Sequence, residues 1–133
     1  NISKGGYVVY GDSSNPDAII IATGSEVSIS VSAAEQLKIK GVNIRVISMP
    51  CQEVFERQTL AYKNKCIPKN FDNILAIESG IGDSWYKFVG KKGAMITMES
   101  FGLSGTGRDV MNHFGFSVSN IKKNINKLIK KNR

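Results

Sequence analysis

Four short apolar runs constrain the fold of this chain more than any other feature. They lie at residues 18–24 (AIIIATG), 42–50 (VNIRVISMP), 73–79 (NILAIES) and 94–100 (AMITMES). Unbroken apolar runs of this length are typical of strands covered on both faces, as in a parallel sheet between layers of helices. A further run, GGYVVYG at 5–11, alternates enough to predict a short leading strand.

A helix is predicted between the first two of these covered strands. Its apolar residues recur at helical spacing: Val27, Val31, Ala34 and Leu37. Thr23 and Glu26 have the spacing of a capping box, with Ser25 as a competing cap. Gly41 is expected to end the helix, with Val42 packing back against it.

Helical patterns also follow the later strands. Residues 51–68 predict one or two short helices closed by Pro68, and 83–90 (DSWYKFVG) predict another with Asp83 as its cap. Short helical segments are expected at 109–113 and at the basic end of the chain. Strand alternates with helix throughout, and right-handed crossovers make this pattern a three-layer α/β/α sandwich.

Length and composition favour a single domain over residues 1–133. A chain of 133 residues buries roughly two thirds of its unfolded surface, and no apolar run reaches the ~20 residues of a membrane span. The start, NISKGG, has no Met and no secretory signal. We therefore expect a piece of a longer polypeptide, with residues 1–6 as the end of an interdomain linker.

The net charge of +7 is distributed unevenly. Residues 119–133 contain six basic residues and no acidic one, so they hold 6 of the 7 net positive charges. Such a block suits nucleic acid, anionic lipid or an acidic protein surface. Its apolar residues, however, recur at helical spacing: Ile121, Ile125, Leu128 and Ile129. Because no aromatic residue is interleaved for base stacking, we expect a solvated lysine face, with neither nucleic acid nor membrane as a partner.

The cysteines and the histidine offer little chemistry. Cys51 and Cys66 are too few for a disulfide framework, and His113 is the only histidine for a zinc site. A reducing, cytoplasmic setting fits this composition. Cys51 follows Pro50 near a helix start, but its only base would be one distant histidine, so a half-buried packing residue is favoured over a nucleophile.

A glycine-rich loop, FGLSGTGRDV at 101–110, follows the last covered strand. Its G-x-x-G-x-G order reverses the dinucleotide fingerprint, and it lacks the lysine of a P-loop. Arg108 with Ser104, Thr106 and Gly107 is nevertheless a candidate anion site at the following helix start, where free backbone N–H groups point outward. The alternative is that Ser104 or Thr106 caps that helix and the glycines only turn the chain.

Three carboxylates and an aromatic cluster lie near the expected carboxyl ends of the strands. Glu26, Glu78 and Glu99 form an imaginable set for a metal or for acid chemistry, but their spacing singles out no such role. Glu26 is explained by its helix start, and the other two by contacts with a neighbouring domain. The aromatic residues are interpreted as core or interface: Trp85, Tyr86 and Phe88.

Several ordered strings together resemble the carboxyl-terminal domain of transketolase. They are GGYVV, IATGSEVSISV, RVISMPCQEVFERQ, YKNKCIP, AIESGIGDSWYKFVG, ESFGLSG and FGFSVSNI, and they run from about Gly5 to the last helix. Deoxyxylulose phosphate synthase and the β component of 2-oxo acid dehydrogenases share a domain of this type, but SMPCQEVFERQ and WYKFVG are similar to transketolase proper. The chain departs from the family at Gly105 and Thr106, where Ala-Pro is usual, and at Cys51, where Ser is usual.

The resemblance implies a mixed five-stranded sheet in which four strands are parallel and the first is antiparallel. It also implies a dimeric parent enzyme that moves two-carbon ketol units between sugar phosphates with thiamine diphosphate and a divalent metal, Mg or Ca. Those groups belong to the two preceding domains, so no catalytic, cofactor or metal residue is carried over to this chain. We thus expect a non-catalytic domain that packs on its neighbours, supports the dimer and binds a regulatory anion. The alternative is an independent anion- or nucleotide-binding module.

Overall fold

The computed structural model describes residues 2–11, 15–78, 86–97 and 117–133. The elements follow in the order η1 (Ile2–Lys4), β1 (Tyr7–Tyr10), β2 (Ala18–Ala22), α1 (Glu26–Ile39), β3 (Ile44–Ser48), α2 (Gln52–Glu56), α3 (Leu60–Cys66), β4 (Ile74–Glu78), α4 (Tyr86–Val89), β5 (Ala94–Thr97) and α6 (Val118–Lys131). Every strand predicted from the sequence is present, and the segment 51–68 forms two helices. Expectations for Asp83 and for a helix at 109–113 fall outside the described residues.

The five strands form one mixed sheet in the order β1-β3-β2-β4-β5. β1 pairs with β3 in the antiparallel sense, and the other three pairs are parallel. In the centre, Ile20 lies opposite Val46 on one side and Leu75 on the other. The expected topology of four parallel strands with an antiparallel first strand is confirmed.

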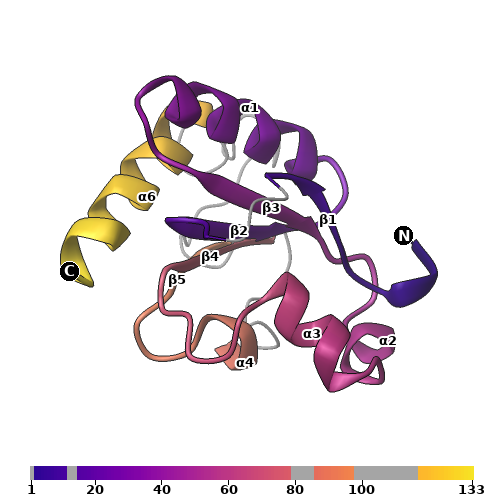
Figure 1. Ribbon diagram of the computed structural model, residues 1–133. Helices are drawn as coiled ribbons and strands as arrows, with labels where there is room; N and C mark the ends of the chain where they lie inside the picture. Colours follow the sequence, from indigo (N-terminus) through magenta and orange to yellow (C-terminus); the bar gives the residue numbers. More distant parts are fainter. Residues whose placement is uncertain (1, 12–14, 79–85, 98–116) are drawn as a thin grey trace.

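Helices cover both faces of the sheet, as Figure 1 shows, with α1 and α6 on one face and α2, α3 and α4 on the other. All five residues of β2 are 0% exposed. Alternate residues of β2 therefore enter two separate cores: Ile20 packs with the α1 and α6 residues, and Ile19 and Ile21 pack with Phe55 of α2 and Cys66 of α3. The three-layer prediction is confirmed.

The start of α1 differs from the predicted capping box. Ser25 is the N-cap residue, but its side chain makes no capping hydrogen bond. The Thr23 hydroxyl instead donates to Glu78 Oε1 at 3.2 Å, a residue of β4. The capping box was therefore wrong, because α1 begins at Glu26, which places Thr23 two residues before the N-cap and Glu26 at the first helical position.

The buried stripe of α1 is wider than the sequence spacing indicates. Ala34 and Leu37 are buried as expected, whereas Val27 and Val31 are half-buried at the edge of the core. Ser30 is fully buried in addition, and its hydroxyl donates to the carbonyl of Glu26 at 2.7 Å. This local bond satisfies the serine, which lets a polar residue occupy a core position.

The end of α1 is the predicted glycine cap. Gly41 has a φ of 86°. Its N–H donates to the carbonyl of Lys38, and the N–H of Val42 donates to the carbonyl of Leu37. These two bonds define the Schellman motif, and Val42 packs on the core beside Leu37.

α6 closes the fold by its apolar stripe and by both of its ends. Ile121, Ile125 and Leu128 are buried as predicted, and the Ser117 hydroxyl caps the helix by accepting from the N–H of Asn120 at 3.1 Å. At the other end, Asn132 Nδ2 donates to Asn73 Oδ1 and to the carbonyl of Lys92, at the amino ends of β4 and β5. Within the described residues, neither α6 nor any other helix has the length and apolar character needed to cross a membrane.

Arg45 is a charged residue inside an otherwise apolar layer. It lies in β3, is 4% exposed, and its Nη1 donates to the carbonyls of Lys65 and Cys66 at 3.0 and 2.9 Å. These carbonyls belong to the last turn of α3, where the helix dipole is negative. The guanidinium therefore joins α3 to the sheet and supplies a hydrogen-bond donor to the carbonyls at the end of α3.

Replacement of Arg45 by alanine is expected to lower the free energy of unfolding by about 3 kcal/mol, because the change leaves buried carbonyls of α3 without their donor. Arg57→Ala removes the same charge from an exposed position and should change the free energy of unfolding by less than about 0.5 kcal/mol. Urea denaturation of both variants measures the difference. Equal losses in the two variants would contradict the tie between β3 and α3.

Candidate functional site

The carboxyl ends of β2, β3 and β4 meet at one end of the sheet, where α/β proteins commonly bind ligands. A pocket of about 310 Å³ lies there. It is lined by Thr23, Met49, Pro50, Cys51, Gln52, Glu53 and Glu78. Thr23 and Met49 directly follow β2 and β3, Glu78 ends β4, and the other lining residues belong to the turn after β3 and the start of α2.

Two of the three carboxylates singled out from the sequence lie at this end. Glu78 accepts the Thr23 hydroxyl, which joins the end of β4 to the end of β2. Glu26 is 7% exposed in the first turn of α1, where the positive end of the helix dipole stabilises its charge. Glu99 lies outside the described residues. The two described carboxylates thus have structural explanations.

Cys51 is half-buried, as expected, and is the N-cap residue of α2. Its thiol donates to Glu53 Oε2 at 3.4 Å. The pKa of the Glu53 carboxyl is lowered, first by a hydrogen bond with its own backbone amide and then by the Cys51 thiol. The thiol thus has a local hydrogen-bond partner in the first turn of α2, which agrees with the packing role expected for Cys51.

The described residues do not fit a metal centre. A divalent cation requires several oxygen or nitrogen ligands from converging side chains. In the part of the chain that the structure describes, no three His, Cys, Asp or Glu side chains are close enough together to hold one. These residues therefore do not match the metal that accompanies thiamine diphosphate in the resemblance, and no chemical step is derived through it.

The leading segment, residues 2–6, is docked beside the pocket. Gly5 and Gly6 are buried, and the N–H of Cys51 donates to the carbonyl of Gly5 at 2.9 Å. Gly5 has a φ of 80°, and a Cβ there would run into the backbone of Phe55 and Cys51. Only glycine fits, because the backbone of the leading segment lies directly against α2.

Tyr62 of α3 holds the same segment from the other side. Its hydroxyl donates to the carbonyl of Gly6 at 2.7 Å. The Lys4 ammonium lies 5.2 Å from the centre of the Tyr62 ring, and the ring meets Phe55 edge-on at 6.1 Å between centroids. A hydrogen bond, a cation–π contact and an aromatic contact thus converge on one side chain.

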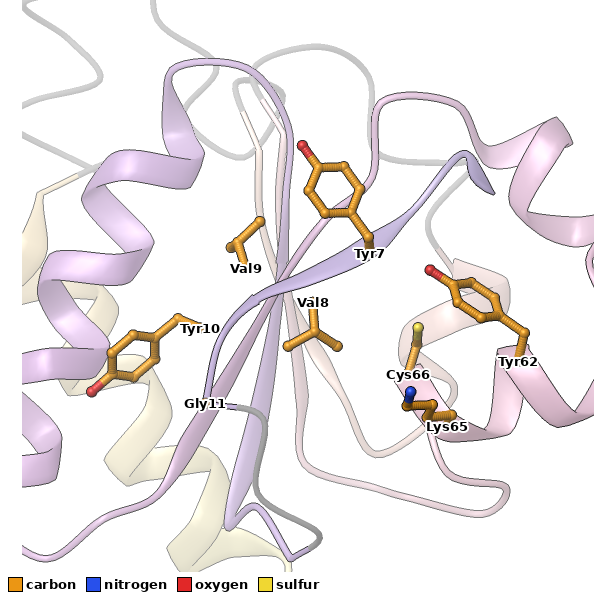
Figure 2. Close-up of a pocket in the computed structure, with 8 residues that line it drawn as sticks. All are labelled: Tyr7, Val8, Val9, Tyr10, Gly11, Tyr62, Lys65 and Cys66. Carbon is orange, nitrogen blue, oxygen red and sulfur yellow. The ribbon is translucent and has the colours of Figure 1, made fainter. Parts of the chain in front are cut away.

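A second pocket, of about 380 Å³, lies between β1 and α3 (Figure 2). In Figure 2, Val8 of β1 points toward the side on which Tyr62, Lys65 and Cys66 lie. Burial, followed by a hydrogen bond with the Cys66 thiol, raises the pKa of Tyr62 to about 12. Burial likewise raises the pKa of Cys66. Both groups therefore stay neutral at physiological pH and act as packing and hydrogen-bonding groups.

Several sequence-predicted residues cannot be placed at either pocket. The candidate anion site of Ser104, Thr106, Gly107 and Arg108 lies outside the described residues. The same holds for His113 and Trp85 and for the Tyr86 side chain. Phe88 packs against Phe55 at 6.0 Å between ring centroids, which confirms its predicted core role.

Sequence reasoning missed Arg45, Tyr62 and the docking of residues 2–6. The arginine inside VNIRVIS was a visible signal, because a charge in the middle of a covered strand requires a buried partner. The paired glycines of NISKGG were a second signal. The sequence around Tyr62 contains no such signal, because its partner Gly6 lies 56 residues away along the chain.

Comparison with known proteins agrees with the fold. The family model described as transketolase-like TK C-terminal domain matches residues 5–117. A probable transketolase of Streptococcus pneumoniae is 42% identical over 127 residues, which cover 96% of this chain and 19% of the relative. Transketolase 1 of Escherichia coli is 44% identical over 121 residues, covering 91% of this chain and 18% of the relative.

The solved structures give the same result. The transketolase from Leishmania mexicana superposes with a TM-score of 0.84 at 31% identity and covers 98% of this chain and 18% of its own. This chain thus spans about a fifth of the length of the curated relatives that it matches. Its sequence, its sheet order and these matches together show that the chain belongs to the transketolase C-terminal domain family.

Proposed function

We propose that this chain works as the non-catalytic C-terminal domain of a dimeric transketolase. The whole enzyme would transfer two-carbon ketol units between sugar phosphates in the cytoplasm, as part of the pentose phosphate pathway. Thiamine diphosphate, with Mg or Ca, would supply the carbanion chemistry and would be bound by the two preceding domains. The domain itself would pack on those domains and support the dimer.

The docked leading segment is the observation that carries this proposal. Residues 2–6 are fixed by Cys51 of the α2 start and by Tyr62 of α3. These short contacts and the burial of the two glycines pack the segment against α2 and α3. A domain held this way transmits its position rigidly to whatever polypeptide adjoins residues 2–6, which suits a supporting role.

The direction of β1 strengthens the argument. β1 is antiparallel to β3, so its first residue, Tyr7, lies opposite Ser48 at the carboxyl end of the sheet. The leading segment therefore lies at the same end as the pocket of Thr23, Cys51 and Glu78. A preceding domain joined there would face this pocket and Glu78, which agrees with the interpretation of that carboxylate as a contact with a neighbouring domain.

Gly5→Ala in the full-length protein tests this role, with Gly41→Ala as a matched control. Both glycines have a left-handed φ, of 80° and 86°, so both alanines carry similar backbone strain. Only at Gly5 would the new Cβ also press on α2, whereas nothing lies within 4 Å at Gly41. We expect Gly5→Ala to weaken dimerisation by about tenfold more than Gly41→Ala, by sedimentation equilibrium. Identical dimer constants would contradict a supporting role for the docked segment.

The isolated chain of 133 residues tests the non-catalytic assignment. We expect it to fold, to show no ketol transfer from a ketose phosphate to an aldose phosphate, and to give no heat of binding with thiamine diphosphate and Mg²⁺. The full-length protein provides the positive control in the same assays. Turnover above the uncatalysed background would overturn the assignment.

A regulatory anion site at Ser104, Thr106, Gly107 and Arg108 is the second part of the proposal, and an independent anion- or nucleotide-binding module is its rival. Both rest on the glycine loop and on the attraction of a helix start for anions. Calorimetric titration of the isolated chain with sugar phosphates and with nucleotides, repeated on Arg108→Ala, separates them when ketol transfer is measured in parallel on the full-length protein. A regulatory site predicts binding that Arg108→Ala weakens and that changes ketol transfer, whereas the rival predicts nucleotide binding without effect on turnover. No binding of either class would exclude both.

A further inference from the structure

α6 presents a basic face to solvent on the side away from the sheet. Lys123, Lys127 and Lys130 are exposed, while the apolar stripe of the helix is buried. Spacings of four and three residues place the three lysines on one side of the helix. α6 carries no acidic residue. Its solvent side is therefore a continuous strip of positive charge.

The end of α1 adds an exposed apolar residue beside this strip. Lys122 Nζ donates to Gln36 Oε1 at 2.9 Å, which joins α6 to the last turns of α1. Ile39 lies three residues beyond Gln36, on the same flank of α1, and is 84% exposed. Its neighbours Lys38 and Lys40 are exposed as well. An isoleucine thus protrudes at the rim of a basic surface.

Acidic groups nearby reduce this charge only in part. Glu35 is exposed one turn before Ile39. Asp72 pairs with Lys92 at 3.8 Å, and the Asp17 carboxylate accepts from the N–H of Asn43 at 2.7 Å. Set against the six basic residues at 119–133 and two at the end of α1, these carboxylates leave the surface strongly positive.

The surface lies at the opposite end of the domain from the leading segment. Asn132 at the end of α6 contacts the amino ends of β4 and β5, whereas residues 2–6 lie at the carboxyl ends of the strands. Figure 1 shows the two chain ends on opposite sides of the sheet. A domain that adjoins the leading segment would leave this surface open.

We propose that this surface docks on a bilayer that contains anionic lipid. We call it the basic face; it consists of Lys38, Ile39, Lys40, Lys123, Lys127 and Lys130. Lysines close to a negatively charged leaflet are attracted to it, and a protruding isoleucine gains by entering the boundary of the acyl chains. Sequence spacing alone favours a solvated lysine face without a membrane partner; the placement of Ile39 beside α6 is what the structure adds. Nucleic acid would use the lysines but would gain nothing from Ile39, and α6 has no aromatic residue for stacking.

Vesicle sedimentation of the full-length protein tests the electrostatic part. We expect binding to vesicles of phosphatidylcholine with phosphatidylserine, none to phosphatidylcholine alone, and a decrease as salt screens the charges. The triple variant K123Q/K127Q/K130Q should bind about 100-fold more weakly, since each lysine contributes about fivefold. K63Q/K65Q/K87Q removes as many charges from α3 and α4 on the other face of the sheet and should retain binding. Unchanged thermal unfolding of both variants shows that the fold is intact.

Ile39→Ser tests whether the basic face binds a bilayer by inserting an apolar side chain. It should weaken vesicle binding by about tenfold, whereas Leu60→Ser, which alters a 69% exposed residue on α3, should not. Failure to sediment with phosphatidylserine vesicles at low salt would overturn the proposal. Equal losses of vesicle binding in the two triple variants would also overturn it. So would an Ile39→Ser variant that binds vesicles as well as the wild type does, if the protein also binds a short duplex RNA more tightly than it binds vesicles. The proposal does not depend on the proposed role of the chain in transketolase, because dimerisation and ketol transfer are measured separately from vesicle binding.

Discussion

The complete burial of β2 is the constraint on which the rest of the structure depends. A strand with no exposed residue must be covered on both faces and paired on both edges, so it requires a sheet of several strands between two helical layers. Its isoleucines enter alternate cores, which commits α1 and α6 to one face and α2, α3 and α4 to the other. Polar chemistry is thereby displaced from the faces to the two ends of the strands.

Arg45 is the exception, and it shows how the core accommodates a charge. Its neighbours in β3 are apolar and buried, yet the guanidinium finds acceptors in the last carbonyls of α3. The same helix contains Tyr62, whose ring makes a cation–π contact with Lys4 and whose hydroxyl donates to the carbonyl of Gly6. One short helix therefore links a buried charge in the centre of the sheet to the leading segment at its edge. Helix propensity alone would not stabilise seven residues, so these tertiary bonds are what fix α3.

The sequence was sufficient for the fold because the fold depends on local, repeated signals. Each covered strand is an apolar run, and Gly41 with Val42 indicates the end of α1 within a few residues. The capping box failed because α1 begins at Glu26 and its N-cap is Ser25. Thr23 instead bonds to Glu78, whose proximity follows only from the pairing of β2 with β4. Tyr62 illustrates the same limit: it is not unusual in its own segment, and its bond to Gly6 exists only after the chain has folded. The anion site at 104–108 remains a prediction, since it lies outside the described residues.

The antiparallel direction of β1 places the leading segment and the end of α6 at opposite ends of the strands. Had β1 been parallel, the leading segment would lie at the amino ends of the strands, the end at which Asn132 of α6 contacts the turns before β4 and β5. Because it is antiparallel, residues 2–6 instead contact the turn after β3, where Cys51 both lines the pocket and donates to Gly5. Residues 2–6 are thereby joined to the start of α2 at the carboxyl ends of the strands, while Asn132 joins the end of α6 to the turns before β4 and β5 at the amino ends. A single reversal of strand direction thus determines which end of the sheet the leading segment occupies.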